Sequence, residues 1–193
     1  MAKGITVKTV VLYETMFGST RQIAEAIAAG AEAYADVTLV SLADGNAPDI
    51  SDTDLVIAGA PTHALTMPTA ASRKQAQQWA DDSTKPFTLD GDAATTGVRE
   101  WLDVVAPQEC SFATFDTRTG LMSHLPGSAA AQIDKLLRKR RMTRVARAES
   151  FIVENGGGLR DGELERATRW GAEVARSFIR GAESPTHTPP ARG

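Results

Sequence analysis

The 193-residue sequence has a single cysteine and no long apolar run. One cysteine, Cys110, excludes an internal disulfide and any metal site built from several thiolates. Because it directly precedes an apolar stretch, we expect a small packed side chain rather than a reactive thiol. No stretch is apolar for long enough to cross a bilayer, and the first residues lack the apolar core of a secretion signal. We therefore expect a cytoplasmic protein that has no membrane partner.

Several motifs of nucleotide and hydrolytic chemistry are also missing. The sequence has no G-x-x-x-x-G-K-[ST] loop and no G-x-G-x-x-G after a strand, which argues against a P-loop nucleotidase and the usual dinucleotide fold. It has neither H-E-x-x-H nor G-x-S-x-G. His63, His124 and His187 are too scattered to form a metal site, so we expect no bound metal. The glycines at 156–158 are interpreted as a mobile turn away from any ligand.

The composition fits one folded domain. Apolar residues make up 42% and charged residues 23% of the chain, as in ordinary globular proteins. We place the domain at residues 3–181 and expect the polar, proline-containing tail at 182–193 to be disordered.

Positive charge is concentrated late in the chain. Residues 121–193 hold 13 basic and 8 acidic side chains, whereas the whole chain has a net charge of −3. Much of the excess lies in a basic run within residues 135–147, on a segment whose apolar residues have helical spacing. We interpret the run as the solvated face of a helix rather than as a surface for nucleic acid or an acidic protein.

Short β-rich runs alternate with amphipathic helical stretches, which is typical of a parallel sheet with crossover helices. The pattern predicts an α/β fold: an open, doubly wound, five-stranded parallel sheet with helices on both faces, for which we take the order 2-1-3-4-5. Ligands of such sheets bind beyond the carboxyl ends of the strands, where the strand order reverses. The expected strands are 7–13, 37–42, 55–60, 111–115 and 144–153; the expected helices are 19–34, 71–79, 97–105, 128–140 and one from about 161; and the loops at the ligand end are 14–20, 61–67 and 116–127.

The first of these loops has the chemistry of a phosphate site. It offers three hydroxyls, successive backbone amides and the positive end of a helix dipole, with Ser19 or Thr20 expected to cap the helix. Gly18 lets the backbone turn closely around an anion. An ordinary capped turn is the alternative interpretation. The candidate phosphate ligands are Thr15, Met16, Phe17, Gly18, Ser19 and Thr20.

These residues carry a resemblance to a known family. The strand VVLYE followed by TMFGST, a later strand ending GAPTH, and the final ESFIVE and DGELERA segments resemble the flavodoxin family over residues 3–179. The resemblance implies a flavodoxin-like FMN-binding domain, with the FMN phosphate held by the TMFGST loop. It also implies contacts with the flavin ring from Pro61, Thr62, His63, Ala64, Thr117, Arg118, Thr119 and Gly120.

The sequence also departs from that family. Flavodoxins that shuttle single electrons usually place aromatic residues against the ring, but the loops at 61–67 and 116–127 contain none apart from His63 and His124. No glycine occurs between Pro61 and Asp90, although the family commonly uses a glycine peptide beside the ring. Both absences argue against strong stabilisation of a one-electron-reduced flavin. Three nearby basic residues, Arg73, Lys74 and Arg118, are interpreted as solvated, with contact to an anionic substrate or a nicotinamide phosphate as the alternative.

The expected function is that of an FMN-binding redox protein. It transfers electrons to a redox partner protein, or it is an oxidoreductase that uses NAD(P)H to reduce a small acceptor. The long stretch 64–96 leaves room for a substrate and slightly favours the reductase. The alternative is a flavodoxin-like regulatory or partner-binding module with weak or no flavin binding, which docks through the basic helix.

Overall fold

The computed structural model describes residues 7–45, 47–91 and 96–183. One parallel sheet forms its centre, and the predicted strand order is confirmed: β2-β1-β3-β4-β5, with β6 also paired to β4. The central strand β3 is buried from Leu55 to Ala60, as its continuous apolar sequence predicts. The strands are β1 (Lys8–Tyr13), β2 (Asp36–Ser41), β3 (Leu55–Pro61), β4 (Ser111–Thr119), β5 (Thr143–Arg144) and β6 (Glu149–Val153).

The predicted fifth strand is broken in two. Both β5 and β6 pair in parallel with β4, but Ser111 pairs with Thr143 whereas Phe115 pairs with Glu149. The second pairing is shifted by two residues relative to the first, so the chain bulges between the two strands. The sheet therefore has five strand positions, the outermost being shared by β5 and β6.

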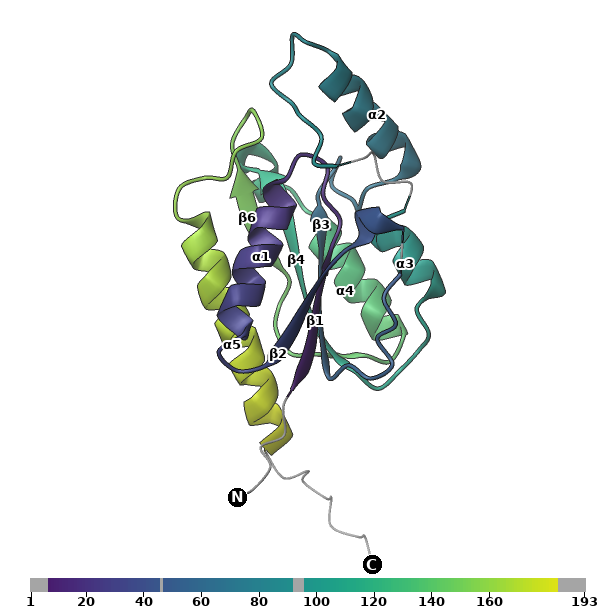
Figure 1. The fold of residues 1–193 in the computed structure, drawn as a ribbon, viewed down its shortest axis with the longest axis vertical. Helices are drawn as coiled ribbons and strands as arrows, with labels where there is room; N and C mark the ends of the chain where they lie inside the picture. The colour runs from purple at the N-terminus through teal and green to yellow at the C-terminus, as the bar shows by residue number, and fades with distance from the viewer. Residues whose placement is uncertain (1–6, 46, 92–95, 184–193) are drawn as a thin grey trace, which may run out of the picture.

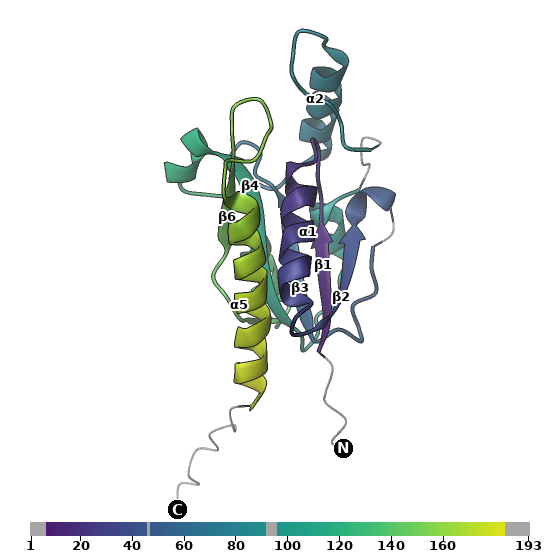
Figure 2. The same ribbon diagram turned by 60° about the vertical axis from the view of Figure 1, so that its left-hand side comes forward.

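Helices cover both faces of the sheet (Figures 1 and 2). α1 and α5 pack together on one face, and α3 and α4 lie on the other, whereas α2 stands beyond the carboxyl ends of the strands. α1 and α5 approach closely because Gly30 has no side chain: a Cβ there would lie 1.9 Å from the carbonyl oxygen of Thr168. The helices are α1 (Ser19–Ala31), α2 (Ala70–Asp81), α3 (Val98–Val104), α4 (Ala129–Lys139) and α5 (Glu163–Glu183), with short 3-10 turns η1 (Leu42–Asp44) and η2 (Gly120–His124).

Alternate residues of each strand enter two separate cores. Leu12 and Phe112 face α3 and α4, while Val11 and Phe115 face α1 and α5. Cys110 is buried at the edge of the first core, as predicted, and burial raises the pKa of its thiol to about 11. A thiol with so high a pKa is a poor nucleophile at neutral pH.

Strand β4 is longer than predicted. Residues 116–119 were expected to begin a polar loop, but Asp116 pairs with Ala60 of β3, and Thr119 pairs with Val153 of β6. The apolar pattern stops at Phe115, although the backbone continues in the sheet because strands on both sides supply hydrogen-bond partners. The polar end of β4 is therefore held rigidly between its neighbours.

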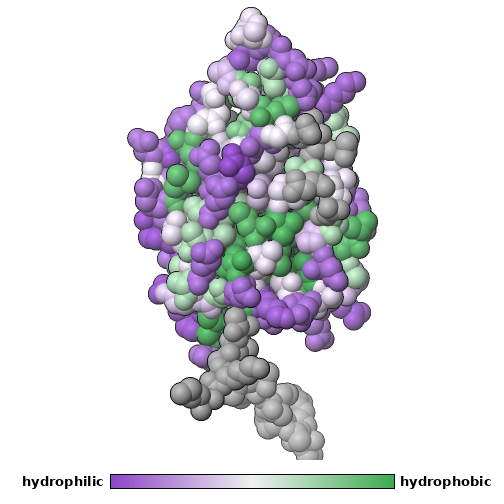
Figure 3. All heavy atoms as spheres, in the orientation of Figure 1, coloured by the Kyte–Doolittle hydropathy of each residue, from purple (hydrophilic) through white to green (hydrophobic). Residues whose placement is uncertain are grey.

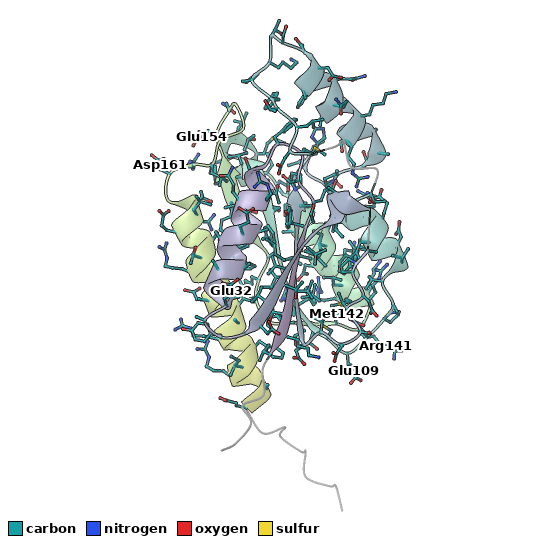
Figure 4. The ribbon with its side chains drawn as sticks, viewed as in Figure 1. Glu32, Glu109, Arg141, Met142, Glu154 and Asp161 are labelled. Atoms are coloured by element: carbon teal, nitrogen blue, oxygen red, sulfur yellow. The ribbon has the colours of Figure 1, made fainter. Side chains whose placement is uncertain are left out.

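The basic segment lies at the opposite end of the sheet from α2, where Figure 4 labels Arg141 and Met142. α4 is amphipathic, and Ser128 caps it as predicted by accepting from the Ala131 amide. Lys135 and Lys139 are exposed, in line with a solvated face. Arg140 instead turns back and donates to the carbonyls of residues 102 and 105 at the end of α3.

Helix α5 continues two residues into the stretch predicted as a tail, and residues 184–193 lie outside the described part of the chain. Among the described helices, none combines the length and apolar character needed to span a membrane. The face seen in Figure 3 is mixed, with hydrophilic residues along much of its outline and hydrophobic ones across its middle.

Candidate functional site

A cavity of about 320 Å³ lies at the carboxyl ends of β3, β4 and β6, beside the first turn of α1. This is the end of the sheet at which doubly wound folds bind ligands. Its walls come from five separate stretches of chain and from α2. The lining residues are Met16, Phe17, Ser19, Thr20, Pro61, Thr62, His63, Trp79, Phe87, Thr117, Arg118, Thr119, Val153, Glu154, Asn155, Gly156 and Gly157.

Most of the residues predicted for the site lie around this cavity. Residues from the first loop, from the loop after β3 and from the end of β4 meet there although they are far apart in sequence. Four predicted residues do not line it: Thr15, Gly18, Ala64 and Gly120.

The first loop is shaped by Gly18 rather than by a capping hydroxyl. Gly18 is the N-cap of α1 and has a φ of 88°, a left-handed conformation that favours glycine. The Thr15 Oγ1 accepts a hydrogen bond from the Gly18 amide at 3.1 Å. The prediction that Ser19 or Thr20 caps the helix is therefore wrong, because the helix already begins at Ser19. The amides of the first turn of α1 have no partner within the helix, and the positive end of the helix dipole lies beside the cavity.

The other two hydroxyls of the loop bond to distant segments. Ser19 donates from Oγ to the carbonyl oxygen of Gly157, and the Oγ1 atoms of Thr20 and Thr117 lie 2.7 Å apart. The glycine turn was predicted to lie away from the ligand region, but Gly156 and Gly157 form part of the cavity wall. The reason is the sheet order, which places the end of β6 next to β4 and close to α1.

Thr15 faces a second, more polar cavity of about 510 Å³, which Arg21 and Asp90 also line. Arg21 and Asp90 form an ion pair at 2.7 Å, and the hydrogen bond from Arg21 to Asp90 is the main cause that raises the pKa of Arg21. The Asp90 amide also donates to the carbonyl oxygen of Met16. The first loop is thus flanked by a carboxylate whose charge Arg21 neutralises.

Aromatic side chains form one wall of the main cavity. The rings of Phe17 and Phe87 stack with centroids 4.8 Å apart, and those of Phe87 and Trp79 stack at 5.6 Å. His63 lies 6.1 Å from Trp79. Trp79 and Phe87 were not predicted, because aromatic contacts were expected only from the loops directly after the strands. The signal that could have found them is the presence of two large aromatic residues in the otherwise polar stretch that begins with α2.

A buried ion-pair network fixes α2 to the end of β1. Glu14 directly precedes the first loop and is 1% exposed, and Arg73 of α2 donates to it at 2.7 Å. Arg73 also pairs with Glu100 of α3 at 2.7 Å, and the second Glu14 oxygen accepts from the Val98 amide. Burial acts to raise the pKa of Glu100, but hydrogen bonds from Arg73 leave that pKa below its ordinary value. The prediction of a solvated Arg73 is wrong, whereas Lys74 is exposed.

Arg118 is also buried, contrary to the prediction of a solvated side chain. It lies in β4, is 6% exposed and lines the cavity. Its Nη2 donates to the carbonyl oxygens of Met122 and Leu125. Its position in a paired strand, rather than in a loop, explains the burial.

The comparisons with known proteins agree with this geometry. Residues 10–87 match the family model described as a flavodoxin domain. The predicted resemblance to the flavodoxin family is confirmed. The matched flavodoxin region runs from β1 through the first loop, α1, β2, β3 and α2 to Phe87. No curated protein matches the chain.

Solved flavodoxins share the fold across almost the whole chain. A flavodoxin from the domain Archaea is 19% identical with a TM-score of 0.58, covering 90% of this chain and 99% of that one. Flavodoxin 1 from Bacillus cereus is also 19% identical, with a TM-score of 0.58 and coverages of 90% and 97%. The flavodiiron core of Flv1 from Synechocystis is 17% identical with a TM-score of 0.60, and the match covers 93% of this chain but 38% of that protein.

Proposed function

We propose that this protein binds FMN and acts as a flavodoxin-like redox protein. The observation that carries the proposal is the cavity at the reversal of strand order, which joins the first turn of α1 to the ends of β3 and β4. When bound, the flavin would supply the electron chemistry, and the protein would hold it and tune its potential.

The residues present suit each part of that cofactor. The helix amides and the Ser19 and Thr20 hydroxyls suit a phosphate, and no lysine is needed because the dipole favours an anion. The volume of about 320 Å³ lies in the range of small-molecule sites. Phe17, Trp79 and Phe87 offer flat apolar surface for a fused ring system.

The absorbance spectrum of freshly purified protein tests FMN binding. We expect the visible bands of a flavin, and denaturation should release FMN into the filtrate. Protein that is colourless, and that does not bind added FMN in a fluorescence titration, would contradict the proposal. Titration with riboflavin, which lacks the phosphate, measures what the first loop contributes.

Two modes of electron flow fit this site: exchange with a redox partner protein, and NAD(P)H-dependent reduction of a small acceptor. The rings of Trp79 and Phe87 enlarge the apolar surface of the cavity, which suits a flat cofactor ring in either mode. Mixing FMN-loaded protein anaerobically with NADH or NADPH separates the two modes. Bleaching at a rate that saturates with nucleotide supports the reductase, and no bleaching supports the carrier.

One observation favours a flavodoxin-like regulatory module with weak or no flavin binding instead. The hydroxyls of Thr15, Ser19 and Thr20 all have partners within the protein, and the Asp90 carboxyl lies about 3.6 Å from where a Gly18 Cβ would be. A protein that folds stably and binds no FMN at any accessible concentration would support this module.

A further inference from the structure

A guanidinium without a carboxylate partner lies in the wall of the main cavity. The Nε of Arg118 is buried and has no hydrogen-bond partner. Its Nη2 bonds only to backbone carbonyls, those of Met122 and Leu125. Within residues 7–45, 47–91 and 96–183, no ion pair includes Arg118.

Such an arrangement is unfavourable unless something else supplies negative charge. Burying an unpaired charge is strongly unfavourable, and carbonyl dipoles offset only part of the cost. The acidic residue on the same face of β4 is Asp116, two positions earlier and fully buried. Its Oδ2 accepts from the Ala130 amide at 3.1 Å, and its Oδ1 has no partner, so Asp116 is not bonded to Arg118. An anionic ligand in the cavity that Arg118 lines would supply a partner for this guanidinium.

We propose that Arg118 is the counter-charge for the negative charge that the flavin ring gains on two-electron reduction; this rests on the proposed FMN binding. A hydride from a nicotinamide donor, which would itself be oxidised, would bring two electrons and one proton, so a neutral oxidised ring would gain one negative charge. A guanidinium is charged at all accessible pH values, and its planar N–H groups suit a planar, delocalised anion. Arg118 thereby favours the two-electron-reduced form over the oxidised form.

The midpoint potential of the FMN-loaded protein tests this assignment. Arg118→Gln should lower the preference for reduced over oxidised FMN about tenfold or more, which is about 30 mV for a two-electron couple. Arg118→Lys keeps the charge and should retain more of the potential than Arg118→Gln. The matched control is Arg138→Gln, because Arg138 is a half-exposed arginine of α4 that pairs with Asp134 and does not line the cavity. Its loss should leave the potential unchanged.

A measurement on the unmodified protein covers the case in which the Arg118 variants do not fold. When reduction takes up two protons the potential falls about 60 mV per pH unit, and when it takes up one proton it falls about 30 mV. A nearby cation stabilises the anionic reduced ring, so the change to the smaller slope should occur at lower pH in the protein than in free FMN. The same change at the same or higher pH would overturn the proposal.

Each outcome separates this inference from the proposed function. If the protein binds no FMN, both fail together. If it binds FMN but Arg118→Gln leaves the potential unchanged, the role of Arg118 fails and FMN binding stands. An unchanged potential combined with weaker NADP⁺ binding in Arg118→Gln would also overturn the inference, since it assigns the cation to a substrate phosphate.

Discussion

The two walls of the main cavity are built in different ways. The wall beside α1 comes from one continuous stretch, residues 16–20, whose shape is set by local turns and hydrogen bonds. The second wall combines a ring from α2, a ring from the following loop, the residues at the end of β3 and of β4, and the turn after β6. The first wall is thus a local motif, and the second exists only because the sheet brings distant segments together.

The buried Arg73 fixes α2, which carries Trp79 of the second wall, to the residue that precedes the first loop, and its removal should have the largest effect. Among the described residues, Arg73→Met leaves the buried Glu14 carboxylate with the Val98 amide as its remaining partner. We expect the free energy of unfolding to fall by about 3–5 kcal/mol, measured by urea denaturation. FMN affinity should fall as well, because α2 carries Trp79.

The double variant Glu14→Gln with Arg73→Met removes both charges and should recover part of the lost stability. Lys85→Gln is the surface control: its pair with Asp82 is exposed, and the loss should be below about 1 kcal/mol. Equal losses for Arg73→Met and Lys85→Gln would show that the buried pair does not hold the walls together.

Loss of a loop hydroxyl should have an intermediate effect that depends on the phosphate. Thr20→Val keeps the shape of the side chain but removes its hydroxyl from the cavity wall. A hydrogen bond to a charged group contributes about 1.5–3 kcal/mol, so we expect FMN to bind about ten- to hundredfold more weakly. Riboflavin affinity should not change, and Thr15→Val should weaken FMN through the shape of the loop, because Thr15 does not line the cavity. Unchanged FMN affinity in both variants would place the phosphate elsewhere.

The same contrast explains what could be predicted from the sequence. The alternation of strands and helices, the amphipathic α4 and the first loop follow from local patterns of apolar, capping and hydroxyl residues, and these patterns need no knowledge of distant contacts. The end of β4 escaped prediction because its buried side chains are polar. Arg118 in particular has the composition of a loop residue but lies in a paired strand.

Contacts between distant segments left even less signal in the sequence. The bond from Ser19 to Gly157 spans 138 positions, and the one from Arg73 to Glu14 spans 59. Neither follows from spacing, because both depend on where α2 and the turn after β6 lie once the sheet has formed. The aromatic wall is the same kind of feature, since Phe17 and Phe87 meet only in the folded chain.

Truncation of the aromatic wall should have the smallest effect on flavin affinity, and this effect should not depend on the phosphate. Phe87→Ala removes the ring that stacks on both Phe17 and Trp79. A stacked aromatic pair contributes about 0.5–1.5 kcal/mol beyond burial, so we expect flavin affinity to fall about two- to tenfold. Because the ring and not the phosphate loses a contact, FMN and riboflavin should weaken by the same factor in fluorescence titrations. Phe178→Ala, in α5 and packed against the core on the α1 side, is the control for loss of an aromatic ring away from the cavity. A loss confined to FMN would show that Phe87 supports the first loop instead, and the two walls would then act as one unit.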